Sequence, residues 1–202
     1  MVSTATRNGR LADPLAIEVP RIDVRQMEIT LIGDSPLISH RWSEKAKKEM
    51  LDKQMKKAKT AKDAKDPEAD FRASLYEFPG GGYGFPCVGF KAAAVSACRF
   101  TDTKMTEARG AFHVDGELAK IEGDEPTMRE DMVRIGQGVA DIRYRGEFKN
   151  WRTTLVISYN SAALSPAQII NLFNLAGFGV GVGEWRPEKD GPYGRFHVQT
   201  TD

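Results

Sequence analysis

The chain has 202 residues, which suits one domain or one domain with a sizeable insertion. Hydrophobic residues make up 41% of it, enough for a core, and no apolar run approaches the roughly 20 residues that a membrane-spanning helix needs. The formal net charge of +1 argues against a uniformly basic protein. Because the N-terminal sequence lacks the apolar segment of a secretory signal, we expect a cytoplasmic protein with no membrane partner.

The residue types that bind metals are sparse. Cys87 and Cys98 are the only cysteines and do not form a C-x-x-C pair, so neither a disulfide framework nor a zinc site is expected. His113 and His197 fall in alternating segments and lack a metal-ligand motif. The sequence therefore predicts no metal and no cofactor.

The first third of the chain predicts an arm, a strand and a basic helix. Residues 1–20 contain two prolines and no sustained period, which predicts a flexible arm. Residues 24–32 alternate like a half-buried strand. Ser43 is the expected N-cap of an inserted helix within 43–66. This stretch holds nine lysines and four acids from position 43 to 65, a local excess of five positive charges (nine minus four).

The middle of the chain predicts a hairpin, a helix and a lobe. Residues 76–86 combine aromatic residues with glycine, which is typical of a hairpin, and 88–100 predict a helix rich in small residues. Between 103 and 150, two charged alternating segments at 111–121 and 140–148 flank a stretch rich in Gly, Met and acids. We expect a projecting β-hairpin lobe there.

The last third gives the clearest pattern. Residues 151–160 alternate as a strand, and 164–179 predict a helix with Ser165 as N-cap, Pro166 at its first position and Gly177 as C-cap. A strand at 195–200 closes the chain. Helices on one face of an antiparallel sheet make an α+β protein, compatible with a ferredoxin-like core in 21–202 that carries the helical insertion and the lobe.

Two motifs together resemble the RAMP superfamily, the RRM-like backbone subunits of CRISPR effector complexes. The first is GFPCVGFKAAAVSACR at 84–99, although Cys87-Val88-Gly89 stands where that family has Gly-Ser-Ser. The second is GVGEWRPEKDGPYGRF at 181–196, similar to the family's C-terminal glycine-rich loop. The likeness covers roughly 24–33 and 84–200. It implies an RRM-like nucleic-acid binder of a bacterial host cell, either a CRISPR component or a standalone, phage-borne relative.

The candidate site residues fall into four groups. Backbone N–H groups of a glycine-rich loop can bind phosphate, and aromatic and arginine side chains can stack on bases. The alternative for the loop is a hairpin whose glycines only make tight turns, and for the lysines a solvated helix face. The groups are the loop residues Gly181, Gly183, Trp185, Arg186, Tyr193 and Arg195; His40, Arg41 and Trp42, with Lys45 and Lys48 of the lysine-rich helix; Lys91 and Arg99; and Arg143, Arg145 and Arg152.

Three functions follow from these residues. The favoured one is a non-enzymatic protein that binds single-stranded RNA or DNA and oligomerises along the strand. The alternative is a structural or assembly subunit that binds no nucleic acid. The third is a metal-dependent ribonuclease using an acid near the end of the insertion, where Asp63, Asp66 and Asp70 lie. Because none of these acids matches a catalytic motif, an enzyme is not expected.

Overall fold

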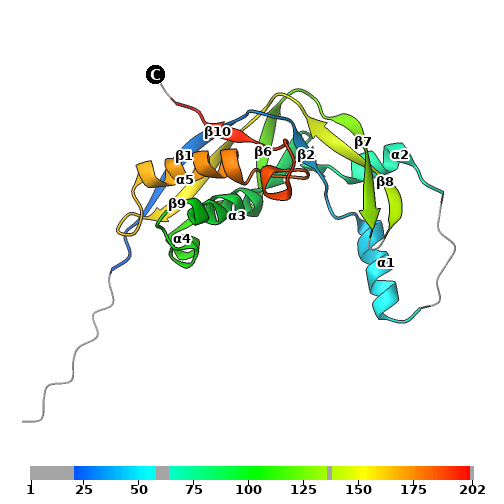
Figure 1. Cartoon of the computed structure of the whole chain (residues 1–202), viewed down its shortest axis with the longest axis horizontal. Helices are drawn as coiled ribbons and strands as arrows, with labels where there is room; N and C mark the ends of the chain where they lie inside the picture. Colours follow the sequence, from blue (N-terminus) through cyan, green and yellow to red (C-terminus); the bar gives the residue numbers. More distant parts are fainter. Residues whose placement is uncertain (1–20, 58–63, 136–137, 201–202) are drawn as a thin grey trace, which may run out of the picture.

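The structure is a computed structural model that describes residues 21–57, 64–135 and 138–200 (Figure 1). The predicted arm at 1–20, the middle of the insertion at 58–63 and the side chain of Lys45 lie outside the described residues. Helices cover one face of a larger sheet, and a smaller sheet stands beside it (Figure 1). Across the described ranges, none of the helices is both long and apolar enough to cross a bilayer.

The elements follow one another as strands, helices and short 3-10 turns. In chain order they are β1 (Val24–Gly33), β2 (Leu37–Ser39), α1 (Glu44–Gln54), α2 (Pro67–Ala73), β3 (Tyr76–Glu77), β4 (Tyr83–Pro86), α3 (Cys87–Ala97), a 3-10 turn (Cys98–Phe100), α4 (Met105–Ala111), β5 (Phe112–Val114), β6 (Leu118–Gly123), β7 (Thr127–Ile135), β8 (Val139–Phe148), β9 (Trp151–Asn160), α5 (Pro166–Gly179), a second 3-10 turn (Pro187–Lys189) and β10 (Phe196–Val198).

The larger sheet has the ferredoxin-like strand order. Its strands run β10-β1-β9-β6-β4-β3, with β5 also paired to β9, and all pairs are antiparallel. The path β1, α3, β5, β9, α5, β10 is a β-α-β-β-α-β unit whose four strands lie in the order β10-β1-β9-β5. The predicted α+β fold with an RRM/ferredoxin-like core is confirmed.

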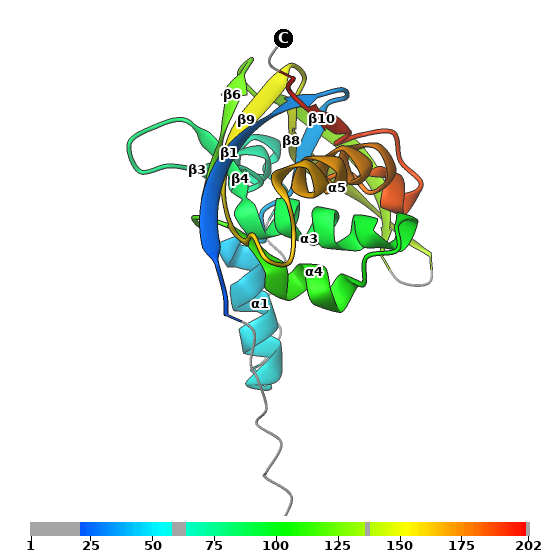
Figure 2. The same cartoon turned by 90° about the vertical axis from the view of Figure 1, so that its left-hand side faces the viewer.

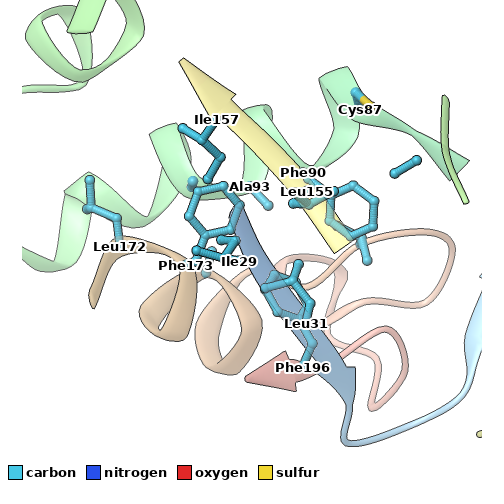
Figure 3. Packing of buried hydrophobic residues seen from close by; sticks show 14 of the residues in the cluster. Ile29, Leu31, Cys87, Phe90, Ala93, Leu155, Ile157, Leu172, Phe173 and Phe196 are labelled. Atoms are coloured by element: carbon cyan, nitrogen blue, oxygen red, sulfur yellow. The ribbon is translucent and has the colours of Figure 1, made fainter. Parts of the chain in front are cut away.

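The core forms between the two central strands and helices α3 and α5. Along β9 every second residue from Trp151 to Tyr159 is buried, as the alternating sequence predicts. Ile29 and Leu31 of β1 point the same way, so that strand and helix side chains interdigitate (Figure 3). Phe90 and Phe173 are fully buried, one from each helix. This apolar layer fixes the sheet against both helices.

Helix α5 begins as the sequence predicts and ends differently. The Ser165 hydroxyl accepts the N–H of Gln168 at 3.3 Å, and the Gln168 side chain accepts the N–H of Ser165 at 2.8 Å, which is a capping box. The prediction that Gly177 is the C-cap is wrong, because the helix continues to Gly179. A β-carbon on Gly177 would lie 1.8 Å from the carbonyl oxygen of Phe196, so glycine is needed for close packing of the helix on β10.

The projecting part of the charged region is the β7–β8 hairpin. It pairs with β2 to form the three-stranded sheet β2-β8-β7, which stands to one side of the core (Figure 1). Residues 105–123, which we expected in the lobe, form α4, β5 and β6 in the main body instead. Phe112 and Ile121 show the reason, because both side chains are buried in the core.

Candidate nucleic-acid interface

A groove runs between the chain after β2, the start of α3 and the loop that follows α5. It consists of two adjoining hollows that share Tyr76. The first, of about 250 Å³, is lined by His40, Gly89, Ala92, Ser96 and residues of the stretch 180–188. The second, of about 440 Å³, is lined by Arg41, Trp42, Lys47, Pro86, Val88 and neighbours. These two hollows together are called the groove below.

The glycine-rich loop (179–195) connects α5 to β10 along one wall of the groove. Between residues 180 and 195, all of which are described, no β-strand forms, so the loop is not the β-hairpin that was expected. Gly181, Gly183 and Gly194 have φ of +70°, +78° and +66°. A β-carbon on Gly183 would lie 2.5 Å from the Ile38 carbonyl oxygen, and one on Gly194 1.8 Å from that of Val182. These glycines allow the loop backbone to approach the protein's own backbone.

Most amides of the loop are used inside the protein. The N–H of Glu184 donates to Ile38 at 3.0 Å, and that of Val182 to Gly194 at 3.0 Å. The N–H groups of Gly183, Trp185 and Arg186 make no hydrogen bond with any described residue. Gly183 and Arg186 also line the groove. Backbone donors that the fold leaves unused are what this loop can offer to an anion.

The two arginine side chains of the loop differ in the hydrogen bonds that they make within the protein. The Arg186 guanidinium donates to Glu188 at 2.9 and 3.2 Å and to the Gly183 carbonyl at 3.1 Å. Arg99 also donates to Glu188. The two guanidinium groups hold the pKa of the half-buried Glu188 below its usual value, although burial opposes them as the largest single effect. In Arg195, Nε is buried without a partner among the described residues.

A buried ionic network joins the hairpin to the loop. Arg145, which the sequence placed on an exposed basic strip, is buried with 6% of its surface exposed. Its guanidinium pairs with Asp131 at 3.1 Å and Glu184 at 3.7 Å, and donates to Nδ1 of His40 at 3.4 Å. Desolvation beside the groove, and then the Arg145 charge, lower the pKa of His40. Arg145 thus holds the wall of the groove in place, and its charge faces protein carboxylates.

Sequence analysis missed Arg129, which covers one of the predicted base contacts. Its guanidinium lies 4.6 Å from the ring centre of Tyr193, donates to the Tyr193 hydroxyl at 3.2 Å, and pairs with Asp131 and Glu147 at 2.8 and 3.0 Å. These three partners raise the pKa of Arg129 despite its desolvation, which is the largest single effect and opposes them. Tyr193 is therefore already stacked within the protein. The signal in the sequence is that Arg129 and Asp131, of opposite charge, are two positions apart in TMREDMVRI at 127–135 and so share one face of a strand.

Several predicted residues do meet along the groove. Trp42 is 52% exposed, with Lys47 6.0 Å from its ring centre. Arg41, paired with Glu44 at 3.9 Å, lies next to it. Trp185 is 39% exposed and lies between the groove residues Glu184 and Arg186, but it does not itself line either hollow. An exposed tryptophan beside two cations is an arrangement suited to stacking on a base.

Other predicted residues lie elsewhere. Arg143 pairs with Asp141 at 2.9 Å on the hairpin, and Arg152 with Glu122 at 3.1 Å on the larger sheet. Lys48 is exposed on α1, and Lys91 lies on the far side of α3. Within the described ranges, no group of three or more His, Cys, Asp or Glu side chains is placed to hold a metal ion.

Fold and groove together define an α+β protein with a ferredoxin-like core and a groove walled by a glycine-rich loop. No protein-family model and no curated protein matches the sequence. Among solved structures, the crystal structure of Cmr6 from Pyrococcus furiosus is similar, with a TM-score of 0.47 and 11% identity. The alignment covers 89% of this chain and 100% of that chain. At this identity the likeness concerns the fold alone.

Proposed function

We propose that the protein binds single-stranded nucleic acid in the groove and is not an enzyme. The observation that supports this most is that Trp42 and Arg41 line one hollow, the glycine-rich loop lines another, and Tyr76 lines both. These residues are about 140 positions apart in the sequence, and the fold brings them to the same surface. The loop N–H groups of Gly183 and Arg186 supply donors for a phosphate, and Trp42 supplies a stacking surface.

A single strand fits this surface better than a duplex does. Stacking on Trp42 requires an unpaired base whose face is accessible. Many RRM domains stack bases on sheet aromatics, but the outward residues of β1 and β9 are polar or aliphatic here: Gln26, Glu28, Thr30, Thr154, Val156 and Ser158. The groove on the helix side is therefore the proposed contact surface, and the face of the sheet is not.

The decisive experiment is a fluorescence-anisotropy titration with labelled poly-dT and poly-U at two salt concentrations. Trp42→Ala should weaken binding by about 5- to 150-fold, since one base stack contributes roughly 1–3 kcal/mol. Met132→Ala is the matched control, because this side chain is 67% exposed on the hairpin and away from the groove. Equal binding by Trp42→Ala and the parent protein would contradict the proposal, as would no binding at low salt.

Two further parts of the proposal need their own tests. Oligomerisation along the strand should appear in sedimentation as species that grow when single strands are added. If the protein sediments as a monomer with and without strands, it does not oligomerise. Incubation with RNA and magnesium tests the ribonuclease alternative. A protein that binds no strand but self-associates would be the assembly subunit. The cytoplasmic location and a role within a CRISPR complex also belong to this proposal.

A further inference from the structure

Three basic residues lie on α3, α4 and β5, which pack together. Lys91 of α3 places its Nζ 3.1 Å from Nδ1 of His113 on β5, and 5.9 Å from the ring centre of Phe112. Arg109 lies in the last turn of α4, which leads directly into β5. Helices α3 and α4 lie side by side at this end of the molecule (Figure 2). These three residues are called the basic triad below.

The basic triad has no acidic partner. Within the described residues, neither Lys91, Arg109 nor His113 forms an ion pair with a carboxylate, whereas Arg99, Arg152 and Arg186 all do. Burial, and then the repulsion from Arg109, lower the pKa of Lys91. Holding cations close together without a counter-charge costs free energy, and a bound anion would offset it.

The triad is separate from the groove. Successive residues of an α-helix are rotated by about 100°, so Lys91 lies about 150° around α3 from the mean direction of Gly89, Ala92, Ala93 and Ser96, which line the groove. One helix thus separates two surfaces. A ligand bound at the triad would not occupy the groove.

We propose that Lys91, Arg109 and His113 form a binding site for a phosphate monoester, the dianionic group that ends a 5′-phosphorylated strand. Three donors from three elements suit a group with three terminal oxygens, while a carboxylate offers two. A charged ammonium group can only donate, so in the contact with Lys91 the Nδ1 of His113 is the acceptor, and the ring N–H on Nε2 can donate to an oxygen. The phosphate site stands on the triad alone. That its ligand is the end of a strand rests on the proposed function.

The first test titrates the full-length protein with inorganic phosphate at constant ionic strength, following the His113 ring signals by NMR. The signals should shift saturably, and Lys91→Gln and Arg109→Gln should each weaken binding at least tenfold. Lys104→Gln is the control, because Lys104 stands at the start of the same α4 but is 76% exposed and paired with Glu107. Melting curves confirm that the variants fold. Shifts that are absent, or that both variants leave unchanged, would overturn the site.

The second test separates the source of the phosphate. Labelled oligo-dT with a 5′-phosphate should bind more tightly than the same strand with a 5′-hydroxyl, and Arg109→Gln should abolish the difference. If phosphate binds at the triad but the two strands bind equally, the strand end is not the ligand. If phosphate binds and neither strand does, the triad stands and the proposed function fails.

Discussion

Three glycines of this protein are explained by contacts within the chain. Gly177, Gly183 and Gly194 each have a backbone atom of another residue where a side chain would begin. From the sequence we expected the backbone N–H groups of the glycine-rich loop to bind phosphate, but the close approach at Gly183 and Gly194 is to the protein's own carbonyl groups. These glycines therefore act mainly on the stability of the fold. Binding depends on the N–H groups of the loop that have no hydrogen-bond partner in the protein.

Replacing Gly177 by alanine should therefore destabilise the fold. The new β-carbon would lie 1.8 Å from the Phe196 carbonyl oxygen, and α5 must shift away from β10 to make room. Overpacking of this kind costs about 1–3 kcal/mol, which urea denaturation measures directly. Gly110→Ala is the matched control, since Gly110 is also helical and has open space around it. It should be neutral or stabilising by up to about 1 kcal/mol. Equal effects of the two substitutions would contradict this account.

Substitutions of Arg145 and Arg143 should lower the free energy of unfolding by different amounts in the same urea assay. Arg145→Gln leaves Asp131 and Glu184 short of a buried partner, and breaking a buried pair costs about 3–5 kcal/mol. We expect a loss near about 3 kcal/mol, since Asp131 keeps its contact with Arg129. Arg143→Gln removes only a surface pair and should cost less than about 1 kcal/mol. An unchanged urea midpoint for Arg145→Gln would show that the network does not stabilise the hairpin.

At the scale of elements, hydrophobic alternation decides what the sequence can predict. β1, β9 and α5 carry clear periods of two or 3.6 residues, and all three are found where expected. β7 was missed because the side chains on its inward face, the half-buried Arg129 and the buried Asp131, are charged rather than apolar. The sequence predicted some residues of the groove, but it did not predict the contacts within it. Arg145, Arg129 and Tyr193 pair inside the protein, and this pairing depends on tertiary contacts.

No described side chain of helix α1 belongs to the buried core. Met50 and Leu51 of α1, and Met55 just after it, are 48%, 54% and 57% exposed. Replacing residues 44–57 by a glycine–serine linker of equal length should thus leave the melting temperature within a few degrees. Strand binding should fall at least tenfold, because Lys47, beside Trp42, and the exposed lysines of α1 are lost. A large drop in melting temperature would mean that α1 supports the fold.

At the scale of the whole molecule, positive charge is not in large excess over negative charge. The chain is nearly neutral, at +1, and most described arginines are neutralised by a carboxylate within 4.0 Å. Exposed cations without a carboxylate partner among the described residues include Lys48 and Lys53 of α1, as well as Arg109 of the basic triad. Affinity for a strand should thus come from a few phosphate contacts and from stacking, and a strongly basic surface is not needed.

This distribution predicts a moderate salt dependence. If about four to six phosphates are contacted, the logarithm of the affinity for a single strand should fall with the logarithm of salt at a slope of roughly −3 to −4. Changing Lys47, Lys48 and Lys53 together to Gln should make the slope shallower by about 2, which is about 0.7 for each lost contact. Lys104 and Lys120, which pair with Glu107 and Glu122 away from the groove, provide the control pair, and changing them to Gln should leave the slope as it is. A slope near zero in the parent protein, or a slope that the α1 substitutions do not move, would show that the phosphates are not held by the lysines of α1.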